Sequence, residues 1–231
     1  SSTVSWRSSR LAVITPIGKH IISTPLEHSS VSGSLTALQE RGWEIDLLSI
    51  GQDGTVDPEE VRELLRPDTV LVAICAVDSE LGTIQPVNEI AALLADHPNC
   101  RLHVDATQAI GRIPVNFAGI DTLSFAPHKF GGICGSGVLL KRSRMPLEPQ
   151  MNGGASTTLY RSGTPALGLA ASSALALQLA CDERENRCAV VQRHSERLRK
   201  ALAAYPAVHI NSPEPFRYWP RPLPAVPCTV I

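Results

Sequence analysis

Hydrophobic residues in this chain follow two local patterns that alternate along the sequence. Short stretches that are apolar throughout, such as residues 70–77 (VLVAICAV), are typical of strands buried on both faces. Stretches with apolar residues three and four apart, such as 87–97 (VNEIAALLADH), are typical of amphipathic helices. Further strands are predicted at 20–25, 43–50, 101–105, 123–125 and 137–140, and further helices at 29–42 and from Pro58 onward. This alternation predicts an α/β fold with a mostly parallel sheet and helices on both of its faces.

Local signals mark where two of these helices begin. A serine is expected to cap the helix at 29–42, and Gly42 stands at its end. Pro58 stands in the first turn of the next helix, where Glu59 and Glu60 lie near the positive end of the helix dipole.

The two ends of the chain differ from its middle. Residues 168–205 are interpreted as one long helix or two, apolar early and charged late. Residues 213–231 form a proline-rich tail whose six prolines prevent a regular helix or a central strand, so the tail is predicted to be irregular. Residues 1–17 begin with a Ser-rich, weakly periodic stretch and are interpreted as an N-terminal arm.

Composition narrows the class of protein. A chain of 231 residues can bury a sizeable core, and a net charge of −1 argues against a nucleic-acid or anionic-membrane partner bound by bulk electrostatics. No apolar run approaches the roughly 18 residues of a membrane span, and the run LAVITPI lacks the pattern of a secretory signal. Six cysteines without paired spacing indicate a reducing compartment, for which the cytoplasm is the default.

Two candidate chemical groups follow neighbouring predicted strands. Asp105 ends one strand and Lys129 comes shortly after the next, at the edge where chemistry gathers in an open α/β sheet. Pyridoxal phosphate needs a lysine to hold it as a Schiff base and a carboxylate to keep its ring nitrogen protonated. On spacing alone, Asp105 could equally cap the next turn and Lys129 could be a solvated loop lysine.

The surrounding motifs carry a family resemblance. HVDATQAIGRIPV, SFAPHKFGG and GGASTTLYRSGTPAL, in register from about Gly18 to Asn211, resemble the cysteine desulfurases, the NifS/IscS-like group of the class V aminotransferases. The resemblance implies the large domain of a fold type I, pyridoxal-phosphate-dependent transferase over residues 18–170. It implies a connecting helix and the start of the small domain over 171–212, with the family's N-terminal part and the rest of its small C-terminal domain lacking.

The same resemblance implies roles for individual residues. Lys129 matches the Schiff-base lysine, Asp105 the partner of the ring nitrogen, and Gln108 the donor to the cofactor's phenolic oxygen. His28 matches the histidine that stacks on the pyridine ring and takes part in proton transfer, and His128 matches a phosphate contact. Without the family, His28 and Gln108 are ordinary polar residues at a strand end and on a helix surface.

A second subunit is implied by the segment RSGTPAL. Thr164 matches a threonine that reaches the cofactor phosphate of the neighbouring subunit, so the resemblance implies a homodimer. The alternative interpretation of this segment is an ordinary glycine turn.

Several positions depart from the family pattern. Ser79 stands where an asparagine is expected beside the cofactor, and Ala126 stands where a serine binds the phosphate. No small-residue loop with a catalytic cysteine is found, since Cys228 lacks such a loop and Cys134 fills a glycine turn. No set of residues keeps metal-ligand spacing, so no metal is predicted.

The implied activity is that of a cysteine desulfurase. L-cysteine would be converted to L-alanine, and its sulfur would pass as a persulfide to an acceptor protein, either an iron–sulfur scaffold or a tRNA-thiolation enzyme. Two alternatives stay open: a related aminotransferase or lyase of another amino acid, and a catalytically incompetent remnant of the fold.

Overall fold

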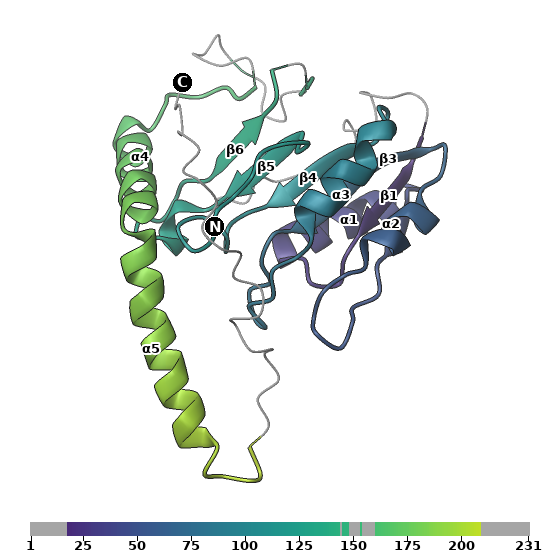
Figure 1. Ribbon diagram of the computed structural model, residues 1–231. Coiled ribbons are helices and arrows are strands. Elements are labelled where there is room, and N and C mark those ends of the chain that lie inside the picture. Colours follow the sequence, from purple (N-terminus) through teal and green to yellow (C-terminus); the bar gives the residue numbers. More distant parts are fainter. Residues whose placement is uncertain (1–17, 144, 148–152, 154–159, 209–231) are drawn as a thin grey trace.

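A computed structural model describes residues 18–143, 145–147, 153 and 160–208 (Figure 1). The predicted N-terminal arm at 1–17 and the proline-rich tail at 213–231 therefore lie outside the described residues. The predicted domain division at 170/171 stays a prediction.

Six strands form a single sheet in the order β2-β1-β3-β4-β5-β6. All neighbouring pairs are parallel except β5 and β6, which are antiparallel, so the mostly parallel sheet is confirmed. The strands are β1 (His20–Ser23), β2 (Glu44–Leu47), β3 (Thr69–Cys75), β4 (Arg101–Asp105), β5 (Thr122–Phe125) and β6 (Val138–Lys141).

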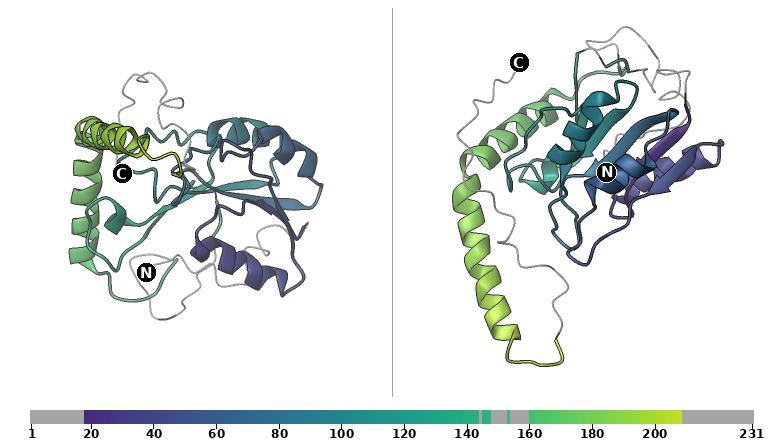
Figure 2. Two further views of the ribbon diagram at one scale, coloured as in Figure 1. Left: turned by 90° about the horizontal axis from the view of Figure 1, so that it is seen from below. Right: turned by 45° about the vertical axis from the view of Figure 1, so that its right-hand side comes forward.

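Helices cover both faces of the sheet, as the sequence predicts. Figure 2 shows α1 (Ser29–Gln39) on one face, and α2 (Pro58–Leu64) with α3 (Val87–Leu93) on the other. A short 3₁₀ turn, η2 (Leu94–Asp96), continues α3. Asp57 caps α2 by accepting a hydrogen bond from the backbone N–H of Glu59, and the proline signal is thus confirmed at the start of this helix.

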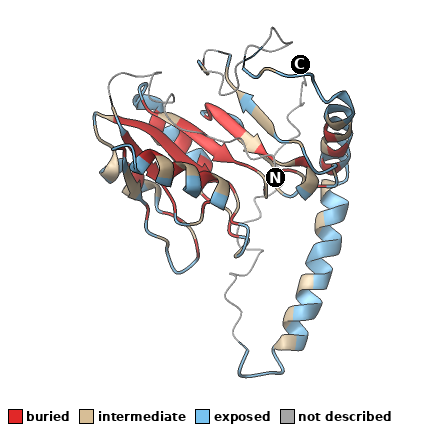
Figure 3. Cartoon of the chain, turned by 180° about the vertical axis from the view of Figure 1, so that it is seen from behind, coloured by how far each residue is buried: buried red, intermediate tan, exposed pale blue. Residues whose placement is uncertain are grey.

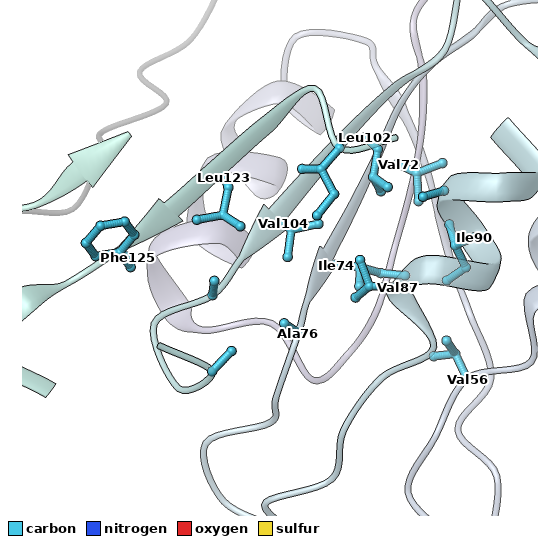
Figure 4. Close-up of a cluster of buried hydrophobic side chains, with 14 of the residues drawn as sticks. Val56, Val72, Ile74, Ala76, Val87, Ile90, Leu102, Val104, Leu123 and Phe125 are labelled. Carbon is cyan, nitrogen blue, oxygen red and sulfur yellow. The ribbon is translucent and has the colours of Figure 1, made fainter. Parts of the chain in front are cut away.

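Two hydrophobic clusters lie on opposite faces of the sheet, and alternate residues of a strand belong to one or the other. On β3, Val72 and Ile74 point into the larger cluster beneath α2 and α3 (Figure 4). Leu71 and Ala73 belong to a smaller cluster with residues of α1. Because both faces are covered, β3 is buried along its whole length, which explains the unbroken apolar run in its sequence.

The described residues 160–208 contain two helices. These are α4 (Leu167–Asp182) and α5 (Arg184–Leu202), which meet at Glu183. Small side chains let α4 approach the turn after β4 closely: a Cβ added at Gly111 would lie 2.7 Å from the Cβ of Ala180. By contrast, α5 buries no residue and extends away from the sheet (Figures 1 and 3). Within the described residues, none of the helices is both long and apolar enough to cross a lipid bilayer.

Candidate functional site

The carboxyl ends of β1, β3, β4 and β5 meet at one edge of the sheet, because these four neighbouring strands are parallel. The residues singled out from the sequence follow these ends: His28 after β1, Ser79 after β3, Asp105 and Gln108 at β4, and His128 and Lys129 after β5. The tertiary structure thus brings to one edge residues from four separate parts of the chain. This edge is where ligands bind in open α/β sheets.

Asp105 is the last residue of β4 and is buried. Its backbone lies beside Cys75 of β3 and Ser124 of β5, in the middle of the edge. Its Oδ1 atom accepts a hydrogen bond from the backbone N–H of Thr107 at 2.8 Å. The turn uses one carboxylate oxygen, so capping this turn is compatible with a second role for the same side chain.

Gln108 and Lys129 are linked by a residue that sequence reasoning missed. Arg112 donates from Nη1 to Oε1 of Gln108 at 2.6 Å and from Nη2 to the backbone oxygen of Lys129 at 3.0 Å. Its position four residues after Gln108 was the only available sign of this contact. The link to Lys129 spans separate loops and has no local signal.

Lys129 ends a short 3₁₀ turn, η3 (Pro127–Lys129), which follows β5. Lys129 is exposed and His128 is half-buried. Ala126 caps this turn without a side-chain hydrogen bond, since it has no polar side chain. After the turn, Gly132 donates from its backbone N–H to the carbonyl of Pro127 at 2.9 Å, and a Cβ here would lie 2.7 Å from the Cβ of Pro127. The loop therefore needs glycine at 132 to keep its path.

His28 is the N-cap of α1, which corrects the expectation of a serine cap. Its Nδ1 atom accepts a hydrogen bond from the backbone N–H of Ser30 at 3.2 Å. A backbone N–H can only donate, so in this contact Nδ1 is the acceptor. The exposed imidazole thus caps α1 just after the end of β1.

Ser79 and Thr164 are both exposed. Ser79 lies in a turn held by Asp78, whose Oδ2 atom accepts hydrogen bonds from the backbone N–H groups of Glu80 and Leu81. Thr164 lies three residues before α4 begins. Its contact with a neighbouring subunit stays a prediction.

Two buried ionisable residues near this edge were also missed. Burial raises the pKa of Glu27 to about 8, and burial lowers the pKa of His103 to about 4. His103 interrupts an apolar run between Leu102 and Val104, and that interruption is the signal that could have found it. Glu27 lies in a polar stretch before His28 and has no such signal.

Metal-binding side chains do not gather in the described part of the chain. No group of three or more His, Cys, Asp or Glu residues there is placed to hold a metal ion.

The donor set at this edge suits a planar aldehyde cofactor with a basic ring nitrogen that a carboxylate keeps protonated. A lysine amine, a buried carboxylate and an amide follow two adjacent strands, and an imidazole follows β1 along the same edge. This arrangement, on a mostly parallel sheet covered on both faces, defines the large domain of a fold type I enzyme.

The chain belongs to the aminotransferase class-V family, whose model matches residues 8–217. Members of this family generally depend on pyridoxal phosphate. The chain is 39% identical over 199 residues to a NifS/IcsS protein homolog of Lactobacillus delbrueckii subsp. bulgaricus, covering 85% of this chain and 52% of that protein. It is 43% identical over 171 residues to a mitochondrial cysteine desulfurase of Arabidopsis thaliana, covering 72% and 38%.

Solved structures show the same fold. A NifS-like protein superposes with a TM-score of 0.77 at 33% identity, covering 85% of this chain and 54% of the other. SspA in complex with cysteine superposes with a TM-score of 0.68 at 29% identity, covering 73% and 49%. The chain spans about half the length, or less, of the relatives and structures that it matches.

Proposed function

We propose that this chain is the cofactor-binding large domain of a pyridoxal-phosphate-dependent cysteine desulfurase. The observation that carries the proposal is the placement of Asp105 and Lys129 at the ends of adjacent parallel strands, with Gln108 tied to the Lys129 loop through Arg112. The names of the relatives and the cysteine complex of SspA support the choice of substrate.

The residues present fit the pyridine end of the cofactor. When bound, pyridoxal phosphate supplies an electron sink for the substrate's bonds at the α-carbon. Lys129 would hold the cofactor through its amine, and Asp105, from its buried position, would stabilise the protonated ring nitrogen. Gln108 would donate a hydrogen bond to the phenolic oxygen. His28 would stack on the ring and take part in proton transfer.

The phosphate end is the weaker part of the fit. His128 would contribute a contact there, but Ala126 offers no hydroxyl. Beside the cofactor and substrate, Ser79 has a shorter reach than the amide of an asparagine. Thr164 of a second copy is proposed to complete this end, which makes the working form a homodimer.

The thiol that receives sulfur is proposed to lie in the part of the relatives that this chain does not match. Burial raises the pKa of Cys75 and raises that of Cys100 to about 12, so neither of these buried thiols is a competent nucleophile. The sulfur would pass as a persulfide to an iron–sulfur scaffold or a tRNA-thiolation enzyme, leaving L-alanine. No disulfide joins the cysteines of the described residues, which supports the cytoplasm as the proposed location.

The proposal is tested by the visible absorption spectrum of the chain incubated with pyridoxal phosphate. We expect a bound-cofactor band that is lost in Lys129→Ala and kept in Lys200→Ala, a matched change on the exposed helix α5. Absence of the band in all three proteins would overturn the proposal and favour a catalytically incompetent remnant. A band that changes with amino acids other than cysteine would instead favour an aminotransferase or lyase.

A further inference from the structure

Arg112 joins the two loops that carry Gln108 and Lys129. Its Nη1 atom donates to Oε1 of Gln108 at 2.6 Å and to the backbone oxygen of the same residue at 3.0 Å, while Nη2 donates to the backbone oxygen of Lys129 at 3.0 Å. One planar guanidinium thus spans the link after β4 and the turn after β5. A lysine could not replace this geometry, since its single ammonium has no rigid fork.

The contact decides which way the amide of Gln108 faces. A guanidinium has donors and no acceptor, so the atom of Gln108 that meets it must be the oxygen. The amide NH₂ group is then turned away from Arg112 and left to donate elsewhere. Arg112 therefore orients the amide of Gln108 so that its NH₂ group can donate to an oxygen of a ligand at this edge.

Helix α5 also contacts the backbone of Arg112. The backbone oxygen of Arg112 accepts a hydrogen bond from Sγ of Cys188 at 3.2 Å. Arg187, the residue before this cysteine, donates from Nη1 to the backbone oxygen of Phe130 at 3.5 Å. The start of α5 therefore braces both loops that Arg112 connects.

We propose that Arg112 is a positioning residue that fixes the amide of Gln108 as a donor toward the cofactor's phenolic oxygen and holds it in register with Lys129. This inference rests on the proposed function for the identity of the ligand. The orientation that Arg112 gives to the amide of Gln108 does not depend on a bound ligand.

The test with cofactor is a pH titration of the bound-cofactor absorption band in the chain and in Arg112→Met, which keeps the aliphatic length and removes every donor. Loss of an ordered donor to the phenolic oxygen should raise the midpoint by about half to one pH unit, the size of one hydrogen bond. The midpoint of Arg112→Lys should fall between those of the parent chain and Arg112→Met. Arg62→Met, at an exposed arginine of α2 that pairs with Glu59, should leave the midpoint unchanged.

A double-mutant cycle separates positioning from a general structural effect. In a Gln108→Leu background, Arg112→Met should cause no further shift of the midpoint, because the amide on which Arg112 acts is gone. A shift of the same size with and without Gln108 would overturn the proposal.

The test without cofactor follows the side-chain amide resonance of Gln108 by NMR, assigned by its loss in Gln108→Leu. It should move in Arg112→Met and stay in place in Arg62→Met. If no protein binds cofactor but this resonance moves as expected, the proposed function fails while the positioning by Arg112 stands. If the resonance does not move, the positioning role is wrong whatever the cofactor does.

Discussion

Glu27 and Cys75 join the ends of two neighbouring strands. Oε1 of Glu27, just after β1, accepts a hydrogen bond from the backbone N–H of Cys75, the last residue of β3, at 2.5 Å. Oε2 of the same carboxyl group is buried and has no hydrogen-bond partner among the described residues. The contact ties the turn that carries His28 to the middle of the sheet, and it places an ionisable group where a charge is costly.

The first expectation concerns stability against pH. Burial raises the pKa of Glu27 from 4.5 to about 8, so the folded chain holds a proton that the unfolded chain releases between these values. The stabilisation from this proton is fully present below about pH 4.5 and is lost as the pH rises toward 8, a change on the order of 3–5 kcal/mol. Urea unfolding measured from pH 5 to pH 9 should show this decline.

Glu27→Gln should remove that decline, because a neutral amide keeps the acceptor oxygen and does not ionise. Glu63→Gln, at an exposed position of α2, should retain the decline seen in the parent chain. An unchanged pH slope in Glu27→Gln would show that this carboxyl group is ionised in the folded protein.

The second expectation concerns His103 on β4. Its Nδ1 atom lies 2.9 Å from Oγ1 of Thr122 and its Nε2 atom 3.3 Å from Oγ of Ser124, and burial lowers its pKa to about 4. As the pH falls, the His103 ring therefore binds a proton at a higher pH in the unfolded chain than in the folded one. The stabilisation that the neutral His103 ring gives the folded chain is present above about pH 6.5. It is lost as the pH falls toward 4, which lowers the free energy of unfolding by roughly 3 kcal/mol.

NMR titration of the His103 ring protons should place the midpoint near pH 4. A midpoint close to 6.5 would mean that the ring reaches water in the folded protein, and would contradict the buried environment.

The third expectation concerns the loop after η3. In Gly132→Ala, the new Cβ would meet Pro127 Cβ at 2.7 Å and its carbonyl oxygen at 3.0 Å, so the loop carrying Lys129 must move. We expect a loss of about 1–3 kcal/mol in the free energy of unfolding and weaker cofactor binding. Gly33→Ala, in the middle of α1 with no atom within 4 Å, should stabilise the chain by up to about 1 kcal/mol instead. Equal effects at both sites in urea unfolding would rule out the steric explanation.

The fourth expectation concerns the phosphate end of the site. Ala126→Ser would add a hydroxyl at the start of η3, where a charge-assisted hydrogen bond to a phosphate is worth roughly 1.5–3 kcal/mol. Equilibrium titration followed by absorbance should therefore show pyridoxal phosphate binding about 10-fold tighter or more. Ala126→Gly, which adds no donor, should bring no gain. A serine variant that binds no better than the parent would place the phosphate elsewhere.

Element types could be predicted from the sequence because hydrophobic periodicity is local. The unbroken apolar run at β3 and the alternation of strand and helix are properties of neighbouring residues, and they led to the parallel sheet and to Asp105 and Lys129 at its edge. Ends were less accurate: the strand predicted at 43–50 covers Glu44–Leu47, and His28 takes the capping role expected of a serine. Such ends depend on a few hydrogen bonds that hydrophobic patterns do not encode.

By itself, then, the sequence determined the α/β class, the family and the order in which the candidate site residues meet the sheet edge. Only the tertiary structure decided which side chains act on one another there. Arg112 reaches Lys129 across 17 residues, and Glu27 reaches Cys75 across 48. Such contacts arise when strands distant in the chain are packed side by side, and the same packing excludes the water that would otherwise keep Glu27 and His103 at their ordinary pKa values.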